Sequence, residues 1–278
     1  MTLRGRRGAE NLMIEGRLWA EPEVAGAYAS WFSKASDMVV PHLVSAVAAG
    51  SDTDALDLCC GHGKVSAGLV ATGARVTGLD FSAAMLDLAR AGVPGARFVN
   101  GDAIQLSFPD ASFDAVTIGF GMPHVPDPPR VLAEARRVLR PGGRIAFSTW
   151  CGPEVDGAFG YVFGAIGSHG SPDIVLPPGP GATDYADPDI AFPVLDAAGF
   201  GEFRSEVVAS CWQVDDPGLA FDFFRDGTAR GGALLRPQPE AHARAIRAAV
   251  VERVLENHGD GPEWTVPMPA VVMSAKVV

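Results

Sequence analysis

The sequence predicts an α/β protein with a doubly wound, mostly parallel sheet. Between residues 54 and 149, short apolar runs that suit strands alternate with amphipathic stretches that suit helices. Strands separated by helices form βαβ crossovers, which make the strands parallel and cover both faces of the sheet. Acidic residues and glycines follow several of these runs. Because ligands bind beyond the carboxyl ends of strands in such sheets, we expect the site there.

Two helices are expected before the first strand. The first begins at Pro22, which suits a first helical turn, and has apolar residues at helical spacing up to Phe32. The second covers about residues 37–49 and ends at Gly50. We expect this N-terminal region, residues 1–50, to form a helical cap.

Residues 51–150 are expected to form the core of the domain. Strands are predicted at 55–59, 75–80, 97–100, 115–119 and 144–149, and helices at 65–71, 83–91 and 127–140. Each helix is long enough to return the chain to the same end of the sheet.

Residues 151–278 are expected to complete the same domain, with insertions at about 151–186 and 213–263. The first insertion is rich in glycine and proline, and a long irregular segment is typical of a lid or binding loop. The remaining expectations are helices at 187–198, 217–225 and 240–257, and strands at 203–212 and 266–278.

Composition restricts the class of function. The chain has 278 residues, 47% of them hydrophobic, and a net charge of −11. This acidic balance argues against nucleic acid as a partner, since phosphates require a basic surface. No apolar run has the length of a membrane helix, no His/Asp/Glu cluster has metal-ligand spacing, and the four cysteines lack paired spacing. We therefore expect a cytoplasmic protein with reduced thiols and no metal.

The segment DALDLCCGHGKV, residues 54–65, is the strongest local motif. It predicts a strand, a tight turn with Gly61 and Gly63, and a helix from about Lys64. Glycines let a ligand approach the backbone closely, and a helix start offers free N–H donors. A dinucleotide fingerprint would have glycine at Cys59 and Lys64, and a P-loop would have Ser or Thr after Lys64, so neither phosphate motif fits.

The motif resembles the D-x-x-x-G-x-G nucleoside loop of class I S-adenosylmethionine-dependent methyltransferases. Four further blocks resemble this family in the same order: 76–86, 100–103, 113–116 and 137–143. The chain resembles the broad group that includes the ubiquinone and menaquinone methyltransferases and natural-product tailoring enzymes. The resemblance implies a Rossmann-like sheet of seven strands, with the last antiparallel, N-terminal helices and a helical lid insertion.

The resemblance also implies a set of cofactor contacts. Asp80 ends the second strand, where a carboxylate can accept both ribose hydroxyls. Asp102 is expected to accept from the adenine amino group, close to the Ala103 N–H. The remaining expected contacts are Phe81 and Met85 at the adenine, Asp57 with carbonyls around Cys59 and Gly61 at the ammonium group, Gly63 in the turn, and Phe120 beside the cofactor. For Phe81 and Met85, ordinary core packing stays an alternative.

Residues for the acceptor are less defined. His124, in the loop after the fourth strand, is the candidate general base, because histidine titrates near neutral pH; a structural or solvated role is the alternative. Aromatic residues of the N-terminal helices and the insertion are candidates to contact substrate or simply to pack: Trp19, Tyr28, Trp31 and Tyr161.

The predicted function is methyl transfer from S-adenosylmethionine, with S-adenosylhomocysteine as product, to O, N or C of a small, largely apolar metabolite. This suits a tailoring enzyme of secondary metabolism. Two alternatives stay open. One is a non-methylating reaction at the same cofactor site, such as cyclisation, hydroxylation or decarboxylation, and the other is a non-enzymatic binding protein. We expect a small-molecule substrate and no membrane insertion; a homo-oligomer stays open.

Overall fold

The computed structural model describes residues 21–176 and 181–278, which form two compact units. Of the described residues, the sheet unit contains 37–150, 181–208 and 270–278, and the aromatic unit contains 21–36, 151–176 and 209–269. Each unit is described below by itself. The predicted division at residues 50 and 150 stays a prediction.

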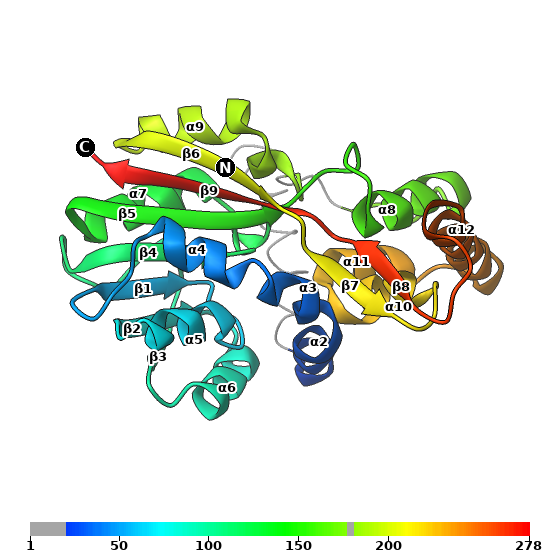
Figure 1. Ribbon diagram of the computed structural model, residues 1–278, viewed down its shortest axis with the longest axis horizontal. Coiled ribbons are helices and arrows are strands. Elements are labelled where there is room, and N and C mark those ends of the chain that lie inside the picture. Colours follow the sequence, from blue (N-terminus) through cyan, green and yellow to red (C-terminus); the bar gives the residue numbers. More distant parts are fainter. Residues whose placement is uncertain (1–20, 177–180) are drawn as a thin grey trace. The chain divides into compact units, whose positions relative to one another are not determined.

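Seven strands of the described chain form the sheet of the first unit, in the order β3-β2-β1-β4-β5-β9-β6 (Figure 1). The pairs from β3 to β5 are all parallel, and β9 is antiparallel to both β5 and β6. The strands are β1 Asp54–Leu58, β2 Arg75–Asp80, β3 Arg97–Asn100, β4 Phe113–Gly119, β5 Leu139–Trp150, β6 Phe200–Val208 and β9 Ala270–Val277. The predicted mostly parallel sheet with an antiparallel last strand is confirmed.

Side-chain caps begin three helices of the sheet unit, α6, α7 and α9. Ser82, before α6, accepts a hydrogen bond from the Met85 N–H, and Asp127, before α7, accepts one from the Arg130 N–H. The helices are α4 Val40–Ala46, α5 Lys64–Ala71, α6 Ala83–Gly92, α7 Pro128–Val138 and α9 Pro188–Ala197, with short 3₁₀ turns η2 Met122–His124 and η3 Asp184–Ala186.

The core of this unit lies along the central strands. Leu56, Leu58, Ile118 and Phe147 are fully buried, on β1, β4 and β5. Strands that are covered on both faces have continuous rather than alternating apolar residues, which explains why the sequence pattern was clear there.

The aromatic unit consists of helices and one small hairpin. Its elements are α2 Pro22–Ala27, the π-helical η1 Tyr28–Phe32, α3 Ser33–Asp37, α8 Ala158–His169, α10 Leu219–Gly227, α11 Ala229–Leu235, α12 Glu240–His258, and strands β7 Cys211–Val214 and β8 Trp264–Pro267. The fully buried Trp212 lies at its centre, with its ring edge-on to Phe32 at 5.1 Å and to Phe223 at 5.1 Å. Edge-on rings add to the stability that burial provides.

Several predicted boundaries were wrong. The helix predicted at 127–140 ends at Val138, because Leu139 is extended (φ −76°, ψ 137°) and begins β5. The single strand predicted at 203–212 is two strands, β6 and β7, which belong to different sheets, and the stretch 266–278 is likewise divided between β8 and β9. The insertion contains the twelve-residue helix α8.

Two further expectations concern the whole chain. No helix in the described ranges has the length and apolar character needed to cross a membrane. The four cysteines are free thiols.

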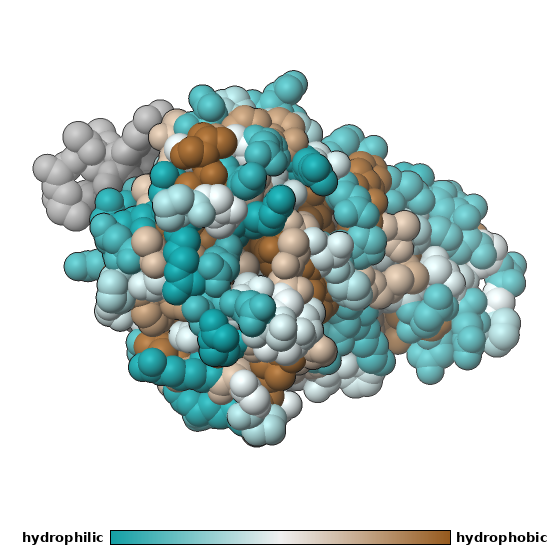
Figure 2. Space-filling view, turned by 60° about the vertical axis from the view of Figure 1, so that its left-hand side comes forward, coloured by the Kyte–Doolittle hydropathy of each residue, from teal (hydrophilic) through white to brown (hydrophobic). Residues whose placement is uncertain are grey.

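Figure 2 shows one face on which hydrophilic residues are widespread and hydrophobic residues lie in smaller areas between them.

Candidate cofactor-binding site

The turn between β1 and α5 has three residues with left-handed backbone: Cys59 (φ 54°), Gly61 (φ 53°) and Gly63 (φ 89°). The Cys60 N–H donates to the Leu79 carbonyl at 3.1 Å, which fixes the turn beside β2. Glycine adopts this conformation without strain, whereas a residue with a Cβ does so at a cost. The sequence therefore folds into a turn that exposes backbone next to the end of β2.

The two glycines serve different purposes. A Cβ added at Gly63 would lie 3.2 Å from the Cβ of Ala89, so this glycine allows α6 to approach closely. A Cβ added at Gly61 would meet no atom within 4 Å. The backbone at Gly61 thus borders open space, as a ligand contact would require.

Asp80, at the end of β2, lies directly beside this turn. Its Oδ2 accepts a hydrogen bond from the Gly61 N–H at 2.8 Å, and its Oδ1 accepts one from the Ser82 N–H at 2.8 Å. Burial raises the pKa of this carboxyl, whereas the hydrogen bonds from the Ser82 and Gly61 N–H groups act in the opposite direction. Each oxygen retains a second lone pair, so the carboxylate can still accept from hydroxyl groups.

Asp57 is fully buried and connects three elements of the sheet unit through hydrogen bonds. Its Oδ2 accepts from the Ser66 hydroxyl at 2.7 Å and its Oδ1 from the Thr117 hydroxyl at 2.9 Å. Burial raises its pKa to about 6, although both hydroxyls favour the charged form. The carboxylate thus links β1 to α5 and β4, and its direct contact with an ammonium group stays a prediction.

The two adjacent thiols lack nucleophilic character. Burial, followed by the charges of Asp80 and Asp57, raises the pKa of both Cys59 and Cys60. Since the thiolate is the reactive form, the two cysteines act as small apolar side chains here.

The predicted adenine contacts lie on the neighbouring loop. The Gly101 N–H donates to the Asp80 carbonyl at 3.0 Å, which brings the loop after β3 next to Asp80. In that loop Asp102 is exposed and Ala103 is buried, and Asp102 Oδ1 accepts from the Ile104 N–H at 3.0 Å. The Phe81 side chain is 47% exposed and thus accessible.

Met85 differs from Phe81. It is 4% exposed and lies in the first turn of α6, within the core of the unit. The burial of Met85 agrees with core packing, and the predicted adenine contacts of Met85 and of the exposed Phe81 ring both stay predictions.

The end of β4 supplies the remaining side of the site. Phe120 has left-handed backbone (φ 57°), its N–H donates to Ser148 Oγ at 3.1 Å, and its ring stacks on Trp150 at 4.0 Å. His124 follows in η2, where its N–H donates to the Gly121 carbonyl at 2.9 Å. Ser148 and Trp150 were not predicted from the sequence, although both lie towards the carboxyl end of β5, the edge where sites form in parallel sheets.

The residues predicted to contact the substrate are Trp19, Tyr28, Trp31 and Tyr161. Trp19 is outside the described residues. Tyr28, Trp31 and Tyr161 belong to the aromatic unit, and their part in substrate binding stays a prediction.

Within that unit, Tyr161 is the centre of a polar cluster. Its hydroxyl donates to Asp156 Oδ1 at 2.7 Å, accepts from Asn257 Nδ2 at 3.0 Å, and lies 3.1 Å from His258 Nε2. These contacts join α8 to the end of α12. Burial raises the pKa of Tyr161 to about 12, so the phenol is neutral at physiological pH.

The described residues contain no group of three or more His, Cys, Asp or Glu side chains that could hold a metal ion. The arrangement of Asp80, the open Gly61 backbone and the exposed Asp102 instead suits a neutral or cationic nucleoside.

The sheet order and the glycine turn define a Rossmann-like fold of the class I methyltransferase type. Residues 56–147 match the family model described as the methyltransferase domain. Demethylmenaquinone methyltransferase of Clavibacter sepedonicus is 48% identical over 103 residues, 36% of this chain and 42% of that protein. The same enzyme of Listeria welshimeri is 44% identical over 113 residues, 38% and 48% of the two chains.

The chain thus spans less than half the length of these relatives. Solved structures extend the likeness of fold over most of the chain. The YcgJ protein from Bacillus subtilis has a TM-score of 0.55 at 16% identity, with 86% of this chain and 97% of that chain covered. A SAM-dependent methyltransferase from Thermotoga maritima has a TM-score of 0.50 at 15% identity, with 88% and 92% covered.

Proposed function

We propose that this protein binds S-adenosylmethionine and transfers its methyl group to an oxygen, nitrogen or carbon of a small, largely apolar metabolite. One observation carries the proposal: the Asp80 carboxylate is held by the Gly61 N–H beside backbone where an added Cβ would meet no atom within 4 Å. A carboxylate and an open glycine backbone at one strand end suit a nucleoside. The methyltransferase-domain match supports this assignment.

The residues present fit this cofactor. Asp80 would hold the ribose hydroxyls, Asp102 and the Ala103 N–H the adenine edge, and the exposed Phe81 ring an adenine face. The turn at Cys59 and Gly61 would hold the methionine end. When bound, the cofactor supplies an electrophilic methyl group on a sulfonium. The protein must place the acceptor atom about 3 Å away in line with the breaking bond.

Proton removal is needed only if the acceptor is a hydroxyl or an acidic carbon. His124 lies in η2, directly after β4 and in the same unit as Asp80. We assign it the role of accepting the proton of such an acceptor. A His124→Gln variant should then lose methyl transfer while it retains cofactor binding.

The acceptor itself is proposed only as a class. The relatives are named for demethylmenaquinone, and the matches cover 36% and 38% of this chain. Demethylmenaquinol therefore belongs in a panel of phenols, amines and acidic carbon compounds, tested by transfer of isotope-labelled methyl groups.

Calorimetric titration with S-adenosylmethionine and S-adenosylhomocysteine tests the cofactor. The Asp80→Ala variant should bind about ten- to a hundredfold more weakly, because it loses hydrogen bonds to a charged group. Asp87→Ala is the matched control, because Asp87 is an exposed residue of α6 that pairs with Arg90. A wild-type protein that binds neither compound would contradict the proposal.

A further inference from the structure

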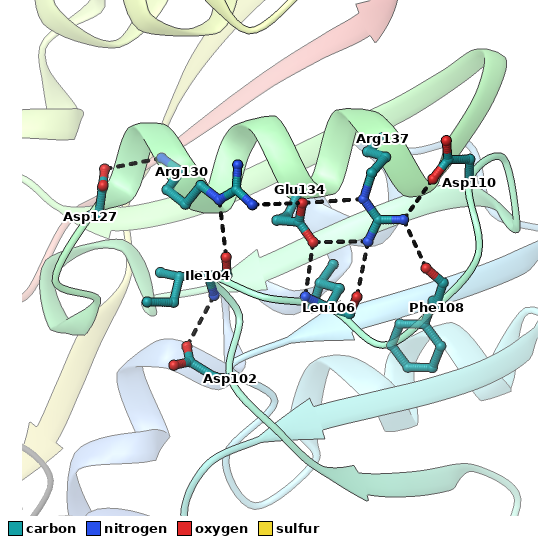
Figure 3. A network of polar contacts seen from close by, with 9 residues as sticks. All are labelled: Asp102, Ile104, Leu106, Phe108, Asp110, Asp127, Arg130, Glu134 and Arg137. Atoms are coloured by element: carbon teal, nitrogen blue, oxygen red, sulfur yellow. Dashed lines mark hydrogen bonds and ion pairs between the residues drawn. The ribbon is translucent and has the colours of Figure 1, made fainter.

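The loop between β3 and β4 contains Asp102 and Ala103 but has almost no regular structure of its own. Helix α7 holds it instead, through charged side chains that reach loop backbone atoms (Figure 3). A loop with few internal hydrogen bonds is positioned by such outside contacts.

Glu134 is the centre of these contacts. Its side chain is only 8% exposed, and Oε2 accepts from the Leu106 N–H at 2.9 Å and from Arg137 Nη2 at 2.8 Å. Its Oε1 accepts from Arg137 Nε at 3.1 Å and lies 3.4 Å from Arg130 Nη2. Arg137 chiefly holds the pKa of Glu134 below its usual range, so the carboxylate is charged.

Arg137 extends the contacts along the loop. Its guanidinium donates to the Leu106 carbonyl at 3.0 Å, the Phe108 carbonyl at 2.8 Å and Asp110 Oδ1 at 2.7 Å. The planar guanidinium, with five donors in fixed directions, suits this task where lysine would not. The backbone of Leu106 and Phe108 and the side chain of Asp110 are therefore held by one residue of α7.

Arg130 continues the network towards the site. Its Nε donates to the Ile104 carbonyl at 3.2 Å, and the Ile104 N–H donates to Asp102 Oδ1 at 3.0 Å. The orientation of the Asp102 carboxylate thus depends on a residue that α7 holds.

We infer that Glu134, Arg137 and Arg130 are positioning residues, which set Asp102 where it distinguishes the adenine amino group from other substituents. This inference rests on the proposed function. None of the three side chains needs to contact the cofactor, because each acts through the loop backbone.

The test compares S-adenosylhomocysteine with S-inosylhomocysteine, in which a carbonyl oxygen replaces the adenine amino group. Calorimetric titration of the full chain measures both. The wild type should prefer the adenine compound by about tenfold or more, since the carboxylate accepts from an amino group but faces a lone pair in the other ligand.

The Glu134→Gln variant keeps the shape of the side chain and removes its charge. It should lose at least about two-thirds of the preference, with its affinity for S-inosylhomocysteine unchanged within about twofold. Arg130→Gln is the second variant, because Arg130 is 54% exposed and its replacement preserves the buried pair. It should lose part of the preference. Glu202→Gln is the control, because Glu202 pairs with Lys276 outside this network and should retain the full preference.

The outcomes separate the two proposals. Variants that keep the full preference, or that weaken both ligands equally, overturn the positioning role and leave the proposed function intact. A wild type that binds both ligands equally overturns the adenine role of Asp102. A wild type that binds neither ligand overturns the proposed function and, with it, this inference.

Discussion

Gly121 faces Cys59 so closely that a Cβ at position 121 would lie 2.6 Å from the Cβ of Cys59. Gly121, the second residue after β4, and Cys59, the first residue after β1, thus share one small space, and only Cys59 carries a side chain. Cys59 occupies the position where the family's loop commonly has glycine, and the glycine at 121 leaves room for it.

This relationship predicts coupling between the two positions. Gly121 has an ordinary backbone (φ −81°, ψ −28°), so Gly121→Ala adds steric overlap without backbone strain. We expect the free energy of unfolding to fall by about 1–3 kcal/mol. Urea unfolding of Gly121→Ala, Cys59→Gly and the double variant should give a coupling energy of about 1 kcal/mol or more. Gly92→Ala is the control, since an added Cβ there meets no atom within 4 Å; simple additivity would contradict the shared space.

A second prediction separates backbone strain from ligand contact at Gly61. Gly61→Ala should cost about 1–2 kcal/mol of stability, because φ is 53°, and should also weaken S-adenosylhomocysteine binding at least about tenfold by filling the open space. Gly142→Ala has comparable strain (φ 76°) near the start of β5. Urea unfolding and calorimetry should show similar losses of stability for both variants, with loss of binding for Gly61→Ala alone. Unchanged binding in Gly61→Ala would remove the turn from the site.

The buried Asp57 predicts a pH dependence of stability. Its pKa is raised from 3.8 to about 6 in the folded state, so the folded state binds the proton more tightly than the unfolded state does. The contribution of this group is fully present below pH 3.8 and is lost as pH rises through about 6, at most about 3 kcal/mol for two pKa units.

Asp57→Asn removes that titration and keeps the shape of the side chain. The Ser66 and Thr117 hydroxyls can rotate to accept from the new amide. The unfolding free energy of the variant relative to wild type should therefore rise between pH 4 and pH 7, as followed by urea titration at several pH values. A difference that is constant across this range would contradict the raised pKa.

The Tyr161 cluster predicts an effect on stability in the aromatic unit. Tyr161→Phe removes the hydroxyl that contacts Asp156, Asn257 and His258 and should lower the free energy of unfolding by about 1–3 kcal/mol. Tyr185→Phe is the matched control, because the Tyr185 hydroxyl has no hydrogen-bond partner within the described ranges, and Tyr185 packs edge-on to Phe147. Thermal unfolding of both variants gives the comparison; equal effects would show that the cluster adds nothing.

The parts of the fold that local signals determine were predicted well. The helix predicted to open at Asp127 is capped by that residue, and β2 and β3 have the predicted bounds. The helix α8 was underestimated because Gly160, Gly164 and Gly167 lower its intrinsic helix propensity, and packing within the unit outweighs that cost.

The candidate site was predictable only where its residues follow strands. Asp80 and Gly61 carry such a signal, and the structure places them in contact. The contacts of Glu134 with Leu106 join residues 28 positions apart in a helix and a loop. No spacing rule in the sequence links two such positions. From the sequence alone, Glu134 would be placed on the solvent-exposed face of its helix.

The place of β9 in the sheet affects how the chain must fold. β6 has β9 as its one neighbour among the described strands, and β9 is the last strand along the sequence. During synthesis, β6 therefore leaves the ribosome long before its hydrogen-bonding partner exists, while β1 to β5 can already pair with one another. The strands of the sheet consequently pair in an order that differs from the order of their synthesis. Residues 200–208 stay without a strand partner in the nascent chain until β9 inserts beside them.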